Sequence, residues 1–393
     1  MNNNAYVPGI IDFSLQGVVD IRLVNPSAAT AKALSRRLGP PRPESSREAD
    51  IVIRFVEDLT PSALTYLGLN QVAFADDAFY LLDEKSSHVQ ALIPFDAIGN
   101  QCEIICRRES RSVPFLFDIV RLTFLKKNYL PLHASAFLHE GQGILVVGWT
   151  KGGKTEMLLS FVSQGATYVG DEWLILSEDG RQMFGLPVPV SIWDWQFRYV
   201  PELLPAIGWQ KRLFFKMVHL LEALQRTSSN RLADKVLPLM LLDQALPYFK
   251  KGLRLRELPE TFFGDRICKR PVPVDKLFLV MSHSNPQIDV QSWDPLDISR
   301  RMATSNEVEQ TDFFACYNAF KFAFPQRQNP LLETAGERQH SLMARALTGK
   351  EAYRVLHPYP VSFTALYEAV RPYCERSTLL PAALAGSVHF GEG

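Results

Sequence analysis

Glycines, a lysine and a threonine at fixed spacing make one segment of the chain the clearest candidate for chemistry. Residues 144–155 read ILVVGWTKGGKT and contain Gly-x-x-x-x-Gly-Lys-Thr, the pattern of a phosphate-binding P-loop. Glycines let the backbone turn tightly and aim N–H groups at phosphate oxygens, and a following helix adds the positive end of its dipole. We expect the nucleotide to be bound by Gly148, Lys151, Gly152, Gly153, Lys154 and Thr155.

The residues on either side of this pattern predict the structural context that it needs. The apolar run 144–147 predicts a buried strand, and residues 155–162 predict a helix. A glycine-rich turn could match the pattern by accident, but strand–loop–helix context favours a true P-loop. Lys154 can then reach the outer phosphates, and the hydroxyl of Thr155 can hold Mg²⁺. ATP and Mg²⁺ are therefore the expected cofactors.

Two acidic residues and one histidine lie close to the P-loop along the chain. Asp171 and Glu172 are on a strand that we predict over residues 166–176, one short helix after the P-loop. Such a helix would return the chain so that both acids face the phosphates. His133 lies on a strand predicted over residues 130–137, directly before the P-loop strand. Each of the three could instead be an ordinary structural or solvated residue.

The chain resembles the HPr serine kinase/phosphorylase family in the order of these features: a strand that carries a histidine, the P-loop, a helix and a pair of acids. His133 matches the family's histidine, and the P-loop matches its Walker A loop, with Thr155 where the family usually has serine. The pair Asp171-Glu172 stands where the family has two aspartates. The resemblance covers residues 130–195, and it extends in outline to residue 325.

This resemblance implies the fold of the phosphoenolpyruvate-carboxykinase-like P-loop proteins and a phosphotransferase activity. It implies that Asp171 accepts the proton of an attacking hydroxyl and that His133 orients Asp171 or contacts a phosphate. Lys154 would hold phosphates in catalysis. Thr155 and Glu172 would bind Mg²⁺, directly or through water.

The expected function is an ATP-dependent, Mg²⁺-requiring kinase that phosphorylates a hydroxyl, most simply serine, of a protein or peptide, whose gene would lie nearby. Two alternatives stay open: a small-metabolite kinase with the same fold, and a non-catalytic nucleotide-binding regulatory protein. The intact Lys154, Thr155, Asp171 and Glu172 argue against the non-catalytic alternative. The N-terminal part would then recognise the substrate or form a homo-oligomer.

Other residues are weaker candidates. Arg266 and Arg270 lie in a basic segment and could neutralise charge on the transferred phosphate, although a solvated loop explains them more simply. Trp193 and Trp195 stand, with a predicted helical insert, where the family continues its own signature. They could stack on a base, but packing in the core is the better interpretation.

Composition excludes several classes of protein. Of 393 residues, 42 are Lys or Arg and 42 are Asp or Glu, so the formal charge is zero and neither a nucleic-acid partner nor an anionic membrane partner is expected. The N-terminal sequence lacks the pattern of a signal peptide. Five scattered cysteines form no metal-binding or disulfide pattern. We expect a cytoplasmic protein.

The hydrophobic patterns predict an α/β protein with three parts. Alternating residues in the first part predict strands at residues 17–24, 50–56, 71–75, 79–82 and 102–107, so residues 1–110 form a β-rich α+β module. Residues 111–330 form the P-loop domain, with a helix at 112–128, a strand at 276–281 and a helical insert near 197–262. Residues 331–393 form a helical C-terminal extension.

Overall fold

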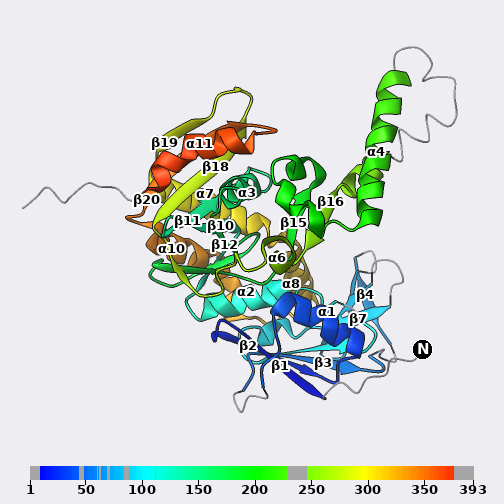
Figure 1. Cartoon of the computed structure of the whole chain (residues 1–393). Coiled ribbons are helices and arrows are strands. Elements are labelled where there is room, and N and C mark those ends of the chain that lie inside the picture. Colours follow the sequence, from blue (N-terminus) through cyan, green and yellow to red (C-terminus); the bar gives the residue numbers. More distant parts are fainter. Residues whose placement is uncertain are drawn as a thin grey trace, which may run out of the picture.

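The chain is a mixed α/β protein, as the sequence predicts, and its described part forms four sheets (Figure 1). A computed structural model describes residues 9–375 except 44–47, 60, 62, 69–70, 84–87, 111 and 229–245. Among these residues, no helix is both long and apolar enough to cross a membrane.

The first part of the chain forms an eight-stranded sheet of order β1-β2-β3-β8-β7-β6-β5-β4. Its strands are β1 Ile10–Leu15, β2 Val19–Val24, β3 Ile51–Val56, β4 Thr65–Leu67, β5 Val72–Ala75, β6 Ala78–Leu82, β7 Val89–Leu92 and β8 Cys102–Arg107. The strands predicted in this part are confirmed. In β2, β3 and β8 every second side chain is buried, as the alternating sequence predicts. Helix α1 (Ala28–Leu38) joins the parallel strands β2 and β3.

This sheet shares one hydrophobic core with the part of the chain that contains the P-loop. Three helices lie between the eight-stranded sheet and that part: α2 (Leu116–Lys126), α8 (Thr311–Ala323) and the short α9 (Pro330–Glu333). Phe95, in a short 3₁₀ helix (Phe95–Ala97), packs its ring against the rings of Phe313 and Phe320 in α8. The side-chain amide of Asn329 donates to the carbonyl oxygens of Phe95 and Ile98. Aromatic packing and buried hydrogen bonds therefore join the two parts.

The P-loop strand lies inside a six-stranded sheet of order β12-β10-β11-β18-β20-β19. Its strands are β10 Ala134–His139, β11 Gln142–Val147, β12 Thr167–Gly170, β18 Lys276–His283, β19 Asp289–Ser292 and β20 Glu351–Pro358. The strands β11, β18 and β20 run parallel, and the other pairings are antiparallel. The C-terminal ends of β11, β18 and β20 therefore meet at one edge, where ligands bind in open α/β sheets.

Both faces of this sheet are covered, which explains why the strand before the P-loop is continuously apolar. Ile144 and Val146 of β11 point to one face and pack in the cluster formed with α3 (Lys154–Val162) and α11 (Phe363–Cys374). Leu145 and Val147 point to the opposite face, toward α7 (Pro295–Val308) and α10 (Ala335–Leu347). All four side chains are fully buried, each contributing roughly 1.5–3 kcal/mol.

Two strands that the sequence predicts as continuous are each broken. The predicted strand 130–137 is divided into β9 (Leu130–Leu132) and β10, and the predicted strand 166–176 into β12 and β13 (Leu174–Leu176). β9 and β13 leave the six-stranded sheet and pair in a separate sheet of order β17-β14-β13-β9, with β14 Gln182–Gly185 and β17 Val272–Pro273. The prediction of single strands is therefore wrong, and the two breaks fall at His133 and at residues 171–173.

The described part of the insert is largely helical, as the sequence predicts. It contains 3₁₀ helices at Asp194–Arg198 and Pro201–Ala206, the long α4 (Trp209–Ser228) and α6 (Pro259–Phe263). It also contains one strand that was not predicted, β16 (Arg254–Glu257), which pairs with β15 (Val190–Trp193). Residues 229–245 lie outside the described part of the chain.

The C-terminal part is mainly helical, as expected, but it is not an extension. It contributes β20 to the six-stranded sheet, beside β18, so it belongs to the same domain as the P-loop. Its helices α10 and α11 cover opposite faces of that sheet. Residues 376–393 lie outside the described part of the chain. The strand at 351–358 reads EAYRVLHP, and its charged residues hid it among its helical surroundings.

Candidate phosphate-binding and acid–base site

The P-loop connects the end of β11 to the start of α3, at the edge where the parallel strands end. Gly148 has φ +159° and Gly153 has φ +107°, the latter in the region that favours glycine. A Cβ at Gly148 would overlap the carbonyl oxygen of Val280 in β18. A Cβ at Gly153 would overlap the imidazole of His357 in β20. The neighbouring strands therefore fix the path of the loop.

Lys154 is the buried cation of this loop. The residue is 6% exposed, and its ammonium donates to the carbonyl oxygens of Gly148 and Trp149, both at 3.0 Å. Burial lowers the pKa of Lys154, and the charges of Asp171 and Glu172 oppose that shift. The lysine thus points back over the loop, where phosphate oxygens could take the place of the two carbonyl oxygens.

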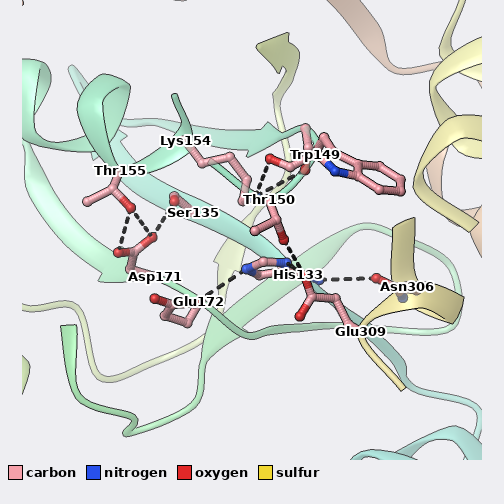
Figure 2. A network of polar contacts seen from close by, with 11 residues as sticks. His133, Ser135, Trp149, Thr150, Lys154, Thr155, Asp171, Glu172, Asn306 and Glu309 are labelled. Carbon is pink, nitrogen blue, oxygen red and sulfur yellow. Dashed lines mark hydrogen bonds and ion pairs between the residues drawn. The ribbon is translucent and has the colours of Figure 1, made fainter. Parts of the chain in front are cut away.

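Asp171 lies at the floor of the site against the first turn of α3. Its Oδ2 accepts a hydrogen bond from Thr155 Oγ1 at 3.1 Å, and its Oδ1 accepts one from the hydroxyl of Ser135 in β10 (Figure 2). The residue is 2% exposed. Burial raises the pKa of Asp171 to about 6, and the neighbouring charge of Glu172 adds to the shift. A cation at this position would restore the charged carboxylate.

His133 lies between two carboxylates at the first strand break. Its Nε2 is 3.3 Å from Glu172 Oε2, and its Nδ1 is 3.0 Å from Glu309 Oε1. Burial alone would lower the pKa of His133, but hydrogen bonds to Glu172 and Glu309 outweigh burial and raise it. Trp173 stacks on the imidazole with ring centroids 5.5 Å apart, and the guanidinium of Arg121 lies over Trp173. The imidazole is held on both edges and on one face.

Glu172 itself has the conformation of a strained residue. Its φ is +69°, in the left-handed region, which is uncommon for a residue other than glycine. The break between β12 and β13 at this position turns the side chain toward His133. The hydrogen bond from His133 lowers the pKa of Glu172 despite partial burial. Strained backbone of this kind is common at functional sites.

Glu309 completes the site and was not found by sequence reasoning. It follows the last turn of α7 and also accepts a hydrogen bond from the hydroxyl of Thr150 in the P-loop. The hydrogen bond from His133 lowers the pKa of Glu309 to about 2. One turn earlier, the buried Asn306 accepts from the backbone N–H of His133 and donates to the carbonyl oxygen of Pro131. The spacing Asn306-x-x-Glu309 on one helix face was the only local signal.

The structure brings the predicted residues together but pairs them differently. Lys154, Thr155 and Asp171 converge at the start of α3, whereas Glu172 lies beside His133. Both ring nitrogens of His133 face glutamates, so Ser135 and Thr155, rather than His133, orient Asp171. Thr155 and Asp171 are thus the adjacent pair at the start of α3, where Thr155 and Glu172 were expected to act together.

The side chains of Thr155 and Asp171 are the kind of ligand that Mg²⁺ prefers. Thr155 Oγ1 and Asp171 Oδ2 are hard oxygen donors that lie within hydrogen-bond distance, 3.1 Å apart. Within the described residues, no group of three or more His, Cys, Asp or Glu side chains is arranged to hold a metal ion. Mg²⁺ in nucleotide sites commonly takes one or two protein ligands and completes its shell with water and phosphates.

The other candidate residues have structural contacts. Arg266 donates to the carbonyl oxygen of Val162 at the end of α3, away from the phosphates. Trp195 packs its ring against Tyr199 and Phe363, which agrees with a core role. A different arginine, Arg256 in β16, is near enough for its charge to lower the pKa of Glu172.

Comparison of the chain with known protein families finds no match, and comparison with curated proteins finds none either.

Proposed function

We propose that this chain is a Mg²⁺-dependent ATP phosphotransferase of the HPr-serine-kinase-like P-loop type that phosphorylates a hydroxyl, preferably serine, of a protein or peptide. One observation carries the proposal: Thr155 and Asp171 lie 3.1 Å apart at the N-terminus of α3, and the pair of Glu172 and His133 lies beside them. This arrangement combines a phosphate cradle, two ligands for a hard cation and a carboxylate for proton transfer.

The P-loop side of the site supplies binding and electrostatic stabilisation. The backbone of residues 151–155 and the ammonium of Lys154 would hold the β- and γ-phosphates. Thr155 and Asp171 would hold Mg²⁺, which would supply positive charge to stabilise the phosphates. The pKa of Asp171, raised to about 6 by burial, supports this assignment because burial leaves the carboxylate in need of a cation.

Glu172 is the better placed carboxylate for the acceptor. Its side chain is 41% exposed, whereas Asp171 is buried and its two oxygens already accept from Ser135 and Thr155. We therefore exchange the two roles that the family resemblance implies. The acceptor oxygen attacks the γ-phosphorus, the bond to the bridging oxygen breaks, ADP leaves with that electron pair, and the acceptor proton passes to Glu172.

A lowered pKa does not disqualify Glu172 as the proton acceptor. In a loose transition state the attacking hydroxyl keeps its proton until late, so position matters more than basicity. His133, which lies between Glu172 and Glu309 and whose pKa is raised by them, fixes that position. Arg256 is near enough for its charge to act on Glu172, and such a charge would help to neutralise the transferred phosphate.

A matched pair of variants tests the proposal. The purified protein is given γ-labelled ATP and Mg²⁺ with serine-containing peptides, HPr or free serine as acceptors. Glu172→Gln should bind MgATP like the wild type but transfer phosphate at least about 100-fold more slowly. Asp171→Asn should lose the Mg²⁺-dependent part of nucleotide binding.

Three outcomes would contradict it. Failure of the wild type to bind ATP would overturn the nucleotide site. Binding without transfer to any class of acceptor would favour a regulatory nucleotide-binding protein. If Glu172→Gln transfers phosphate at the wild-type rate, Glu172 is not the proton acceptor, and Asp171 would have that role instead.

A further inference from the structure

The arm of the insert, defined as α4 with residues 246–251 and the hairpin-like pair β15–β16 at its base, carries an exposed apolar stripe. Trp209, Leu213, Met217 and Leu220 are 73%, 59%, 43% and 61% exposed. Their spacing of four, four and three residues places them on one face of α4. The opposite face, with Phe215 and Val218, is buried. α4 stands out from the body of the protein (Figure 1).

The arm is also strongly basic, in contrast to the neutral chain. Residues 209–228 and 246–257 together have eight Lys or Arg and two Asp or Glu, whereas the whole chain has 42 of each. Arg212 and Lys216 are exposed and, by helical spacing, border the apolar stripe on one side. The exposed face of α4 therefore combines apolar side chains with flanking positive charge.

A further exposed cation lies at the base of the arm. Arg256 is exposed on β16, where it pairs in register with Ser191 of β15. Its charge acts on Glu172 and also on Arg37 of α1, so it is near both the candidate site and the N-terminal module. The base of the arm therefore brings positive charge close to Glu172.

We propose that the arm docks the phosphate acceptor, and that the docked part is an acidic polypeptide segment that presents apolar side chains at helical spacing. Naming this partner the acceptor rests on the proposed kinase function. The partner's apolar side chains would cover Leu213 and Leu220, and its carboxylates would face Arg212 and Lys216. Its serine would reach Glu172 past Arg256.

A polypeptide fits these observations better than an anionic membrane. A membrane would use a basic amphipathic helix without any need for the positive surface to continue into the site. Here an exposed arginine at the base of the arm, Arg256, acts on Glu172, the carboxylate that receives the acceptor's proton. Docking away from the reacting group also provides affinity that a short serine segment in the site would lack.

Binding of a defined peptide tests the docking surface without nucleotide. The probe is a fluorescein-labelled helical peptide of about 18 residues with Glu on one face, Leu at every third or fourth position, and a terminal Ser. Its counterpart has Lys in place of Glu. We expect the wild type to bind the Glu peptide at least about 10-fold more tightly than the Lys peptide, by fluorescence anisotropy.

Two variants separate the apolar and electrostatic contributions. Leu213→Gln with Leu220→Gln removes the stripe, and Arg212→Glu with Lys216→Glu reverses the flanking charge. Each should weaken binding of the Glu peptide about 10-fold or more. The control is Phe322→Gln with Arg181→Glu, which changes an equally exposed aromatic and a cation elsewhere and should bind as the wild type does. Circular dichroism checks that each variant is folded.

The outcomes are distinct. Equal affinity for the two peptides, or no effect of either arm variant, would overturn the proposal. Arm-dependent binding to phosphatidylserine vesicles without peptide binding would assign the arm to a membrane, and arm-dependent dimerisation without peptide binding would assign it to a second copy of the chain. Specific peptide binding without any phosphate transfer would sustain the docking surface and overturn the kinase function.

Discussion

His133 and Glu309 come from opposite ends of the P-loop domain and are joined by a contact of 3.0 Å between Nδ1 and Oε1. Glu309 also accepts from the hydroxyl of Thr150 in the P-loop. The carboxylate therefore ties the tip of the phosphate-binding loop to the imidazole that holds Glu172. A substitution at Glu309 should therefore lower the free energy of unfolding and also change the position of Glu172, the proposed proton acceptor.

Glu309→Gln should destabilise the protein in a defined pH window. The pKa of His133 is raised, so its pairing stabilises below about pH 6.5, the ordinary histidine value, and is lost as pH rises through the folded pKa. The pKa of Glu309 is lowered to about 2. The stabilisation from Glu309 is therefore present above about pH 4.3, the ordinary glutamate value, and it is lost as the pH falls toward 2. Urea unfolding should show a loss of about 1.5–3 kcal/mol near pH 5–6.5, smaller at higher pH.

Glu307 provides the matched control for this prediction. It lies two residues earlier and pairs with His340 at 2.9 Å, but both side chains are about half exposed. Glu307→Gln should therefore change stability by no more than about 0.5 kcal/mol at any of these pH values. If the two substitutions lower the free energy of unfolding equally, the buried His133–Glu309 contact stabilises the protein no more than an exposed pair does.

Mg²⁺ binding should depend on the protonation of Asp171. The pKa of this carboxyl is raised to about 6, so below pH 6 a proton competes with the cation. The Mg²⁺-dependent affinity for ATP should fall up to about tenfold per pH unit below 6 and stay level above it. Calorimetric titration between pH 5 and 8 measures this directly. Asp171→Asn should abolish the pH dependence, and a wild-type profile that is flat through pH 6 would remove Asp171 from the metal.

The sequence predicted the parts of the site that are encoded by local spacing. The P-loop strand, its helix and the nearness of Asp171 to Thr155 follow from short-range patterns, and the structure has them. It did not predict the strand breaks at His133 and Glu172. A strand that passes from one sheet to another keeps its apolar pattern, because both sheets bury it.

Longer-range relationships were out of reach for a different reason. Glu309 meets His133 because α7 packs across the sheet, and the spacing Asn306-x-x-Glu309 does not by itself reveal that contact. The strand β20 was likewise missed, since its place beside β18 depends on the whole chain. Its residue His357 then fixes the conformation of Gly153, which the sequence explained only as a requirement of phosphate binding.

Gly153→Ala should be more destabilising than an alanine at a glycine of similar backbone conformation. Gly153 has φ +107° and a Cβ there would overlap His357, whereas Gly165 has φ +95° and nothing within 4 Å of its Cβ position. Gly165→Ala should cost about 1 kcal/mol from backbone strain alone. Gly153→Ala should cost about 1–3 kcal/mol more, because overlap adds to strain.

Removal of the overlapping ring tests the cause. In a His357→Ala background, Gly153→Ala should cost about as much as Gly165→Ala does in the wild type. The measurement is the free energy of unfolding in urea for the four proteins of this cycle and for Gly165→Ala. If the cost of Gly153→Ala is unchanged when the imidazole is absent, contact with β20 does not determine the loop's conformation.

Lys154→Met should separate binding from folding. The ammonium of Lys154 is buried, and burial lowers its pKa, so the fold gains little from the charge itself. Methionine keeps much of the side-chain volume and removes the cost of burying a cation, although it leaves the carbonyl oxygens of Gly148 and Trp149 without this donor. We expect a change in unfolding free energy of no more than about 1 kcal/mol, together with a loss of ATP affinity of at least about 100-fold.

Lys151→Met is the comparison, because Lys151 is exposed on the same loop and its replacement should weaken binding far less. Equal losses of affinity in the two variants would show that the phosphates respond to the loop's net charge rather than to the buried ammonium.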